Sequence, residues 1–203
     1  MSSAAGPDGQ LDAEELMHLA LGAMERDRDD EALGYLKRAL VLAPDSGLLH
    51  HLLGAMYAEL GMIDRAIQEM TLAITYGPHL RMARFQLGLL HFTSGNLPSA
   101  EEVWAPLAEL PEEDPLRLFR SGLLSLARDD FAACVADLRR GLETNTEHPS
   151  LNHDIEMLVA MAEQAMNEQA GTPPEAAAEV PAAGSGQHIL LSGYQGTPGN
   201  GKG

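Results

Sequence analysis

The stretch LGAMYAELGMIDRAIQEMTLAITYGP, residues 53–78, decides the fold of this chain. Small residues at Gly54, Ala66 and Ala73 recur at helical spacings, and Gly61 interrupts the pattern halfway. A glycine between two runs of helix-forming residues is typical of a turn. The stretch therefore predicts two short helices joined by a tight turn, with small residues where the two helices touch.

The same pattern recurs along the chain with a period of 34 residues. One column of small residues contains Ala20, Gly54, Gly88 and Gly122, and a second contains Ala32, Ala66, Ala100 and Cys134. Pro44 and Pro78 are separated by the same period and end the second helix of their pairs. A repeat of this length indicates a stacked array of helix hairpins.

The columns also predict where the helices begin and end. We expect helix pairs at 12–26/30–43, 46–60/63–76, 80–94/97–109 and 115–127/130–143, followed by a last helix at 150–169 that caps the array. Asp12 and Glu15 have the spacing of a capping box at the first helix. Pro106 should kink or shorten the sixth helix.

The clearest copy, with Leu53-Gly54, Tyr57, Gly61, Ala66, Ala73 and Pro78, resembles the tetratricopeptide repeat, and the resemblance extends over residues 13–146. It implies an all-α fold, a right-handed α-α superhelix of about four hairpins, in a protein of bacterial type. We expect repeats at 13–46, 47–80, 81–114 and 115–148 within a domain of residues 11–169. Residues 1–10 and 170–203 are expected to be a disordered amino terminus and a flexible tail.

Composition and charge narrow the possible partners. Hydrophobic residues form 45% of the chain, and 13 basic residues stand against 30 acidic ones, for a net charge of −17. So acidic a surface repels nucleic-acid phosphates and anionic lipid. The chain has no long apolar run for membrane insertion, and no basic cluster with an apolar run opens it, so we expect a cytoplasmic protein.

Beside the packing stripe of each first helix runs a second, mostly apolar stripe, which in the resembling family lines a concave groove. Its members are Met17, Leu21, Met24, Leu48, His51, Ala55, Met82, Phe85, Leu89, Phe92, Leu116, Phe119, Leu123 and Leu126. One interpretation is that these side chains pack only against neighbouring helices. The other is an apolar groove that binds an extended or helical segment of another protein, for which adaptable methionines are suited.

The tail contains one apolar island in a segment rich in Gly, Pro, Ala and Ser. Residues 188–195 include Ile189, Leu190, Leu191 and Tyr194. Short apolar runs arise by chance, but this one is also suited to be a linear motif that occupies the groove of its own chain or of a second copy. The preceding 17 residues are long enough to reach.

No arrangement of residues indicates catalysis, a cofactor or a metal site. The eight histidines lack the spacings of metal ligands, and Cys134 falls in a packing column, which favours a buried, inert thiol. Residues 196–202 match the opening of a phosphate-binding loop, but the chain ends where the required helix would begin.

The sequence therefore predicts a non-enzymatic interaction module: an adaptor, a scaffold or a dedicated chaperone that binds a partner peptide. The alternative is an obligate structural subunit of a larger complex or homo-oligomer, whose groove is filled by self-association or by its own tail.

Overall fold

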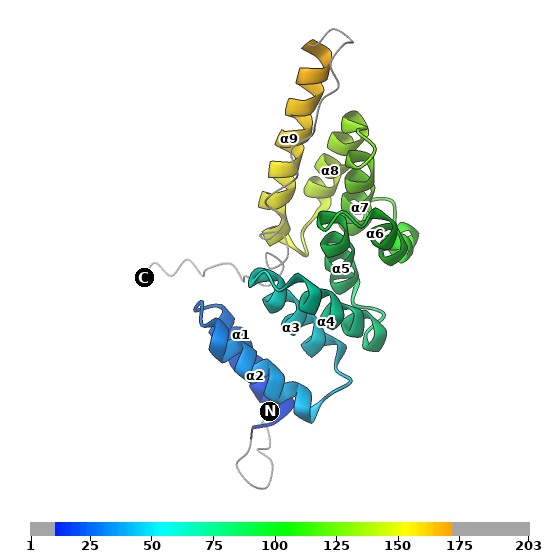
Figure 1. Cartoon of the computed structure of the whole chain (residues 1–203). Coiled ribbons are helices and arrows are strands. Elements are labelled where there is room, and N and C mark those ends of the chain that lie inside the picture. Colours follow the sequence, from blue (N-terminus) through cyan, green and yellow to red (C-terminus); the bar gives the residue numbers. More distant parts are fainter. Residues whose placement is uncertain (1–10, 172–203) are drawn as a thin grey trace. The chain divides into compact units, whose positions relative to one another are not determined.

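A computed structural model describes residues 11–171 of the chain (Figure 1). Within this range the backbone forms nine α-helices and two short 3-10 segments, and no strand. The described residues divide into two compact units, 11–83 and 84–171.

The first unit contains two helix hairpins. Its helices are α1 (Ala13–Met24), α2 (Asp29–Leu42), α3 (Gly47–Glu59) and α4 (Ile63–Tyr76). In Figure 1, α1 lies beside α2 and α3 beside α4, and α2 also packs against α3. These pairs are the hairpins that the repeat predicts.

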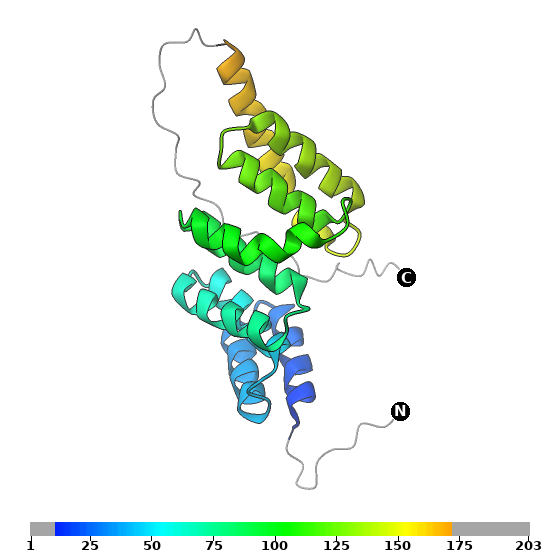
Figure 2. The same ribbon diagram turned by 90° about the vertical axis from the view of Figure 1, so that its right-hand side faces the viewer.

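The second unit continues the pattern and ends in a longer helix. It contains most of α5 (Arg81–Thr93), then α6 (Leu97–Trp104), a 3-10 turn (Ala105–Glu109), α7 (Pro115–Leu126), α8 (Phe131–Thr144), a second 3-10 turn (Pro149–Leu151) and α9 (Asn152–Gly171). The α7–α8 hairpin and the packing of α9 against α8 can be followed in Figure 2.

Side-chain caps define several helix starts. A carboxylate oxygen of Asp12 accepts a hydrogen bond from the backbone N–H of Glu15 at 2.8 Å, and Glu15 Oε2 accepts one from the N–H of Asp12 at 3.0 Å. This reciprocal pair is the predicted capping box. Asp130 caps α8 in a similar way, through the N–H of Ala133 at 3.1 Å.

Except at the carboxyl end of α6, the observed helix ends lie within two residues of those predicted from the repeat. The sixth helix shows the expected effect of Pro106: α6 ends at Trp104, and the chain continues as a 3-10 turn to Glu109. A proline at this position cannot donate to the helical ladder, so the regular helix stops just before it. The all-α hairpin fold is confirmed.

Small residues lie where the helices of a hairpin approach most closely. A Cβ added at Gly54 would lie 2.9 Å from Met70 Cγ, and one at Gly122 would lie 2.6 Å from Leu138 Cδ2. At Gly88 it would overlap the indole ring of Trp104. The glycine column is thus required by the volume of the opposing side chains.

Among the described helices, none combines the length and the apolar character that a bilayer-spanning segment requires.

Candidate protein-interaction site

The structure divides the fourteen residues of the expected groove into two halves. The buried half consists of His51, Ala55, Phe85, Leu89, Leu116, Phe119 and Leu123, and the half that keeps some exposure consists of Met17, Leu21, Met24, Leu48, Met82, Phe92 and Leu126. A binding surface must be reachable, so only the second half can contact a partner directly. The buried half stabilises the fold.

The aromatic members in the second unit form a core cluster around Trp104. The Phe85 ring lies 6.0 Å from the Trp104 ring and 6.3 Å from the Phe119 ring, and the Phe92 ring lies 5.8 Å from Trp104. Trp104 Nε1 donates a hydrogen bond to the carbonyl oxygen of Phe85 at 2.9 Å. Ring pairs at these separations stabilise a packed interior, so Phe85 and Phe119 serve as core.

Helix α1 of the first unit behaves differently, because it has two apolar stripes and only one is covered. Leu16, Ala20 and Ala23 are buried, at 1% exposure or less. The other stripe consists of Met17, Leu21 and Met24, which are all partly exposed. Spacings of four and three residues place these three on one face of the helix, about 100° from the buried stripe.

The remaining four reachable members are scattered over three helices. Leu48 lies in the first turn of α3 and is 40% exposed. Met82 and Phe92 on α5 and Leu126 on α7 are intermediate in exposure. The three-residue stripe of α1 is therefore the largest reachable part of the expected groove that lies on a single element. We call Met17, Leu21 and Met24 the α1 stripe.

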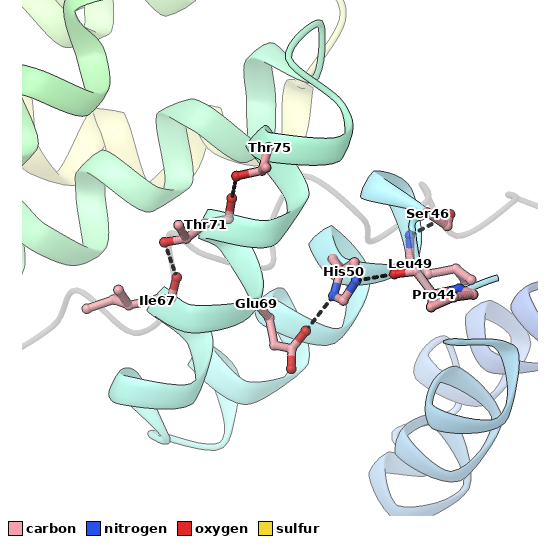
Figure 3. A network of polar contacts seen from close by, with 8 residues as sticks. All are labelled: Pro44, Ser46, Leu49, His50, Ile67, Glu69, Thr71 and Thr75. Carbon is pink, nitrogen blue, oxygen red and sulfur yellow. Dashed lines mark hydrogen bonds and ion pairs between the residues drawn. The ribbon is translucent and has the colours of Figure 1, made fainter. Parts of the chain in front are cut away.

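The structure adds a polar network that the sequence did not indicate (Figure 3). His50 Nδ1 lies 2.7 Å from a carboxylate oxygen of Glu69 on α4, and its Nε2 lies 2.8 Å from the carbonyl oxygen of Pro44. The ring also stacks on Tyr76, with centroids 5.5 Å apart. Since a carbonyl oxygen only accepts, Nε2 must donate. His50 thereby ties the α2–α3 turn to both helices of the next hairpin.

Figure 3 also shows why this region of α4 can carry hydroxyl side chains. Thr71 and Thr75 donate to the carbonyl oxygens of Ile67 and Thr71, each at 2.7 Å. Such bonds satisfy a hydroxyl within its own helix. The histidine network and these threonines are structural features of the hairpin.

The described residues show no further chemistry that indicates a catalytic or metal centre. Within residues 11–171, no three His, Cys, Asp or Glu side chains lie close enough together to hold a metal ion. Cys134 is fully buried, and burial, followed by the nearby Asp137 and Asp130, raises the pKa of its thiol to about 11. Burial also lowers the pKa of His91.

Two parts of the sequence-based expectations lie outside the described residues. They are the amino-terminal segment 1–10 and the tail, including Ile189, Leu190, Leu191 and Tyr194.

Comparison with known proteins supports the repeat. No family model matches the chain. Human tetratricopeptide repeat protein 13 is 26% identical over 116 residues, which is 57% of this chain and 13% of that protein. The chain thus spans only a small part of that relative.

Solved structures show the same arrangement of helices. A chain in the crystal structure of the APC/C hetero-tetramer Cut9–Hcn1 matches 77% of this chain with a TM-score of 0.61 and 20% identity, over 32% of its own length. MamA from Desulfovibrio magneticus RS-1, residues 41 to the end, matches 84% of this chain and 100% of its own, with a TM-score of 0.57 and 15% identity. The described fold is that of a TPR-like helical repeat protein.

This fold is generally a protein–protein interaction module, and scaffolds of this kind are typically non-catalytic. Fold alone does not identify the partner. The reachable side chains determine what the chain can bind.

Proposed function

We propose that this chain is a non-enzymatic adaptor, scaffold or dedicated chaperone that binds an apolar segment of another protein along the α1 stripe. The partner segment is extended or helical and places its own apolar side chains on Met17, Leu21 and Met24. Leu48, in the first turn of α3 and 40% exposed, extends the contact.

One observation carries the proposal: the α1 stripe is apolar, regularly spaced and partly exposed, although a different stripe of the same helix, about 100° away, is already buried in the hairpin with α2. The fold does not need a second apolar stripe on α1 for its hairpin. Two of the three side chains are methionines, whose flexible thioethers adapt to partners of different shape. Apolar residues gathered on one reachable face are typical of an interaction surface.

The burial pattern decides which variants can test this proposal. Phe85 and Phe119 are fully buried, so a glutamate at either position would unfold the second unit and abolish binding for a trivial reason. Met17 and Met24 are partly exposed, and a glutamate there can remain hydrated. The test variant is therefore Met17→Glu combined with Met24→Glu.

Leu19 provides a matched control on the same helix. It is 41% exposed and lies about 140–160° around the helix from the three stripe residues. Tagged full-length chain, the double variant and Leu19→Glu are used to capture partners from the source cells, with quantitative mass spectrometry and circular dichroism on each protein. We expect the double variant to lose its main partner and Leu19→Glu to keep it. Equal capture by all three proteins, with intact helical content, would place the binding site elsewhere.

A second function is favoured by the last helix. Met157 and Met161 on α9 are 40% and 53% exposed and lie one turn apart. An obligate subunit would bury this pair against another chain. Light scattering separates the two functions, because a stable homo-oligomer that dissociates in Met157→Glu, Met161→Glu would favour the subunit, whereas a monomer favours the adaptor.

A further inference from the structure

The outer face of α2 carries an unusual group of exposed residues. Gly34, Lys37, Arg38, Val41 and Leu42 are all exposed. Their spacings of three and four residues make them neighbours on one continuous face of the helix. Val41 is 81% exposed and Leu42 is 55% exposed, which are the two highest values among the large hydrophobic residues of the described chain. We call these five residues the α2 face.

Gly34 has no structural reason to be glycine. It lies in the interior of α2, where glycine weakens a helix relative to alanine. A Cβ added at this position would meet no atom within 4 Å. The glycines at 54, 88 and 122 differ, because each is crowded by an opposing side chain of its hairpin. Because Gly34 has no side chain and lies on an exposed face of α2, the backbone of another helix can approach closely at this position.

Lys37 and Arg38, which lie beside Gly34, have no acidic partner in the described part of the chain. Lys37 Nζ lies 5.8 Å from the centre of the Tyr57 ring, and the Arg38 guanidinium lies 5.9 Å from that of Tyr35. The rings hold both groups in place by cation–π attraction without neutralising them. Of the acidic residues earlier on α2, Glu31 already pairs with Arg28 at 3.0 Å.

Helix α8 is an internal control, since it stands 102 residues later, three periods along the same register. It also has 14 residues, and it carries Ala136, Arg139, Arg140 and Glu143 at the places of Gly34, Lys37, Arg38 and Val41. Arg139 pairs with Glu163 at 2.5 Å, and Arg140 pairs with Glu113 at 2.7 Å. In α8, therefore, an alanine replaces the glycine, and both cations at the equivalent positions are paired with carboxylates.

We propose that the α2 face is a second docking surface, separate from the α1 stripe, and that it binds an acidic amphipathic helix of a partner protein. The partner helix crosses closely at Gly34. Its carboxylates pair with Lys37 and Arg38, and its apolar side chains cover Val41 and Leu42. Charge complementarity selects this occupant, because unpaired cations beside exposed apolar groups match a segment that has carboxylates beside apolar groups.

The test uses a displayed library of helical peptides with randomised surface positions, selected against the full-length chain. Binders are then measured against Val41→Glu and Gly34→Ala, which introduce the residues that α8 has at the equivalent positions. Thr75→Glu is the matched control, since Thr75 occupies the column of Val41 on α4 and is also exposed. Met17→Glu reports separately on the α1 stripe.

We expect the selection to yield peptides rich in Asp, Glu and apolar residues. Val41→Glu should weaken them at least tenfold, since it replaces an apolar contact with a carboxylate that repels the acidic peptide, while Thr75→Glu and Met17→Glu leave them unchanged. Gly34→Ala should weaken them several-fold while raising the Tm by about 2 °C. Loss of binding with a gain of stability separates docking from a fold defect.

Three results would overturn the proposal. One is a selection without binders, or with binders insensitive to both α2 variants. Another is binders affected only by Met17→Glu, which would support the α1 stripe alone. The third is a concentration-dependent dimer of the chain that Val41→Glu abolishes, because the occupant would then be a second copy.

Discussion

Helices α2 and α8 have the same length and bury equivalent positions, but their exposed faces differ in composition. Ala32, Leu36 and Ala39 are fully buried in α2, and α8 buries Cys134, Leu138 and Gly141 at the equivalent positions. On the outside, α8 pairs both of its arginines with carboxylates, whereas α2 exposes Val41 and Leu42 beside unpaired cations. The repeat preserves what the hairpin needs and varies what faces outward.

This difference separates two classes of position in the repeat, the buried columns and the exposed columns. Residues in the buried columns report on folding, because any hairpin of this geometry requires small and large residues at those positions. Residues in the exposed columns are free of that requirement. A cluster of apolar residues at exposed positions therefore indicates a surface that binds a partner.

The largest effect is expected in the buried column. Leu36→Ala and Leu138→Ala should each lower the free energy of unfolding by about 2–5 kcal/mol, because both side chains are fully buried and each substitution leaves a cavity. Val41→Ala, on the exposed face of α2, should change it by less than about 0.5 kcal/mol. Urea denaturation measures all three. A cost below about 1 kcal/mol for Leu36→Ala would show that the two buried faces are not equivalent.

Cys134, which replaces the alanine found at position 32, provides a chemical test. Its pKa of about 11, against an ordinary 9.0, predicts alkylation by iodoacetamide at pH 8 about a hundredfold slower than for a free thiol. The folded chain keeps this proton longer than the unfolded chain does. The thiol's contribution to stability is therefore complete below pH 9 and is lost as the pH rises towards 11.

The alanine variant is the control for this pH effect. Between pH 9 and 11, the Tm of Cys134→Ala should fall less than the Tm of the wild-type protein, because the variant has no thiol to ionise. Thermal unfolding at several pH values measures the difference. Rapid alkylation of the native wild-type protein at pH 8 would contradict the buried position of Cys134.

An intermediate effect is expected at the polar network of the first unit. Glu69→Ala should lower the free energy of unfolding by about 1–3 kcal/mol, because it removes the side chain that contacts Nδ1 of the largely buried His50 ring at 2.7 Å. Glu69→Gln, which keeps an oxygen acceptor, should cost less. Gln68→Ala, on the neighbouring exposed position, is the control for helix propensity. If Glu69→Ala and Gln68→Ala lowered the free energy of unfolding equally, the contact between Glu69 and His50 would not stabilise the fold.

The smallest effect concerns the outer faces themselves. Gly34→Ala should raise the free energy of unfolding by about 0.5–1 kcal/mol, and Ala136→Gly in α8 should lower it by a similar amount. Both positions are exposed, so the change reflects the helix backbone and not packing. Thermal unfolding of the two variants checks the pair. A loss of stability in Gly34→Ala would mean that the glycine is needed by the fold.

Much of the fold could be predicted from the sequence, because the period of 34 residues is a packing constraint. Gly54, Gly88 and Gly122 mark the close contacts of three hairpins, and Pro106 marks the end of α6. These residues act through local sterics, which a single sequence expresses directly.

The candidate site was harder to predict, because an apolar stripe does not reveal what covers it. Phe85 and Phe119 have the same helical spacing as a groove, yet their rings pack with Trp104 in a core cluster. The partner of His50 is Glu69, 19 residues away on the next helix, which no local motif indicates. The α2 face differs from the equivalent face of α8 in its exposed apolar side chains and in its cations without acidic partners, and both depend on which residues of other helices lie nearby.

The most direct test of the account is photo-crosslinking from α1 in the full chain. A benzoylphenylalanine that replaces Leu21, in the middle of the α1 stripe, is compared with one that replaces Leu19, which lies on a different face of the same helix and is 41% exposed. The account predicts that the partner cross-links to position 21 and not to position 19. Cross-linking from position 19 alone, or equally from both, would contradict it.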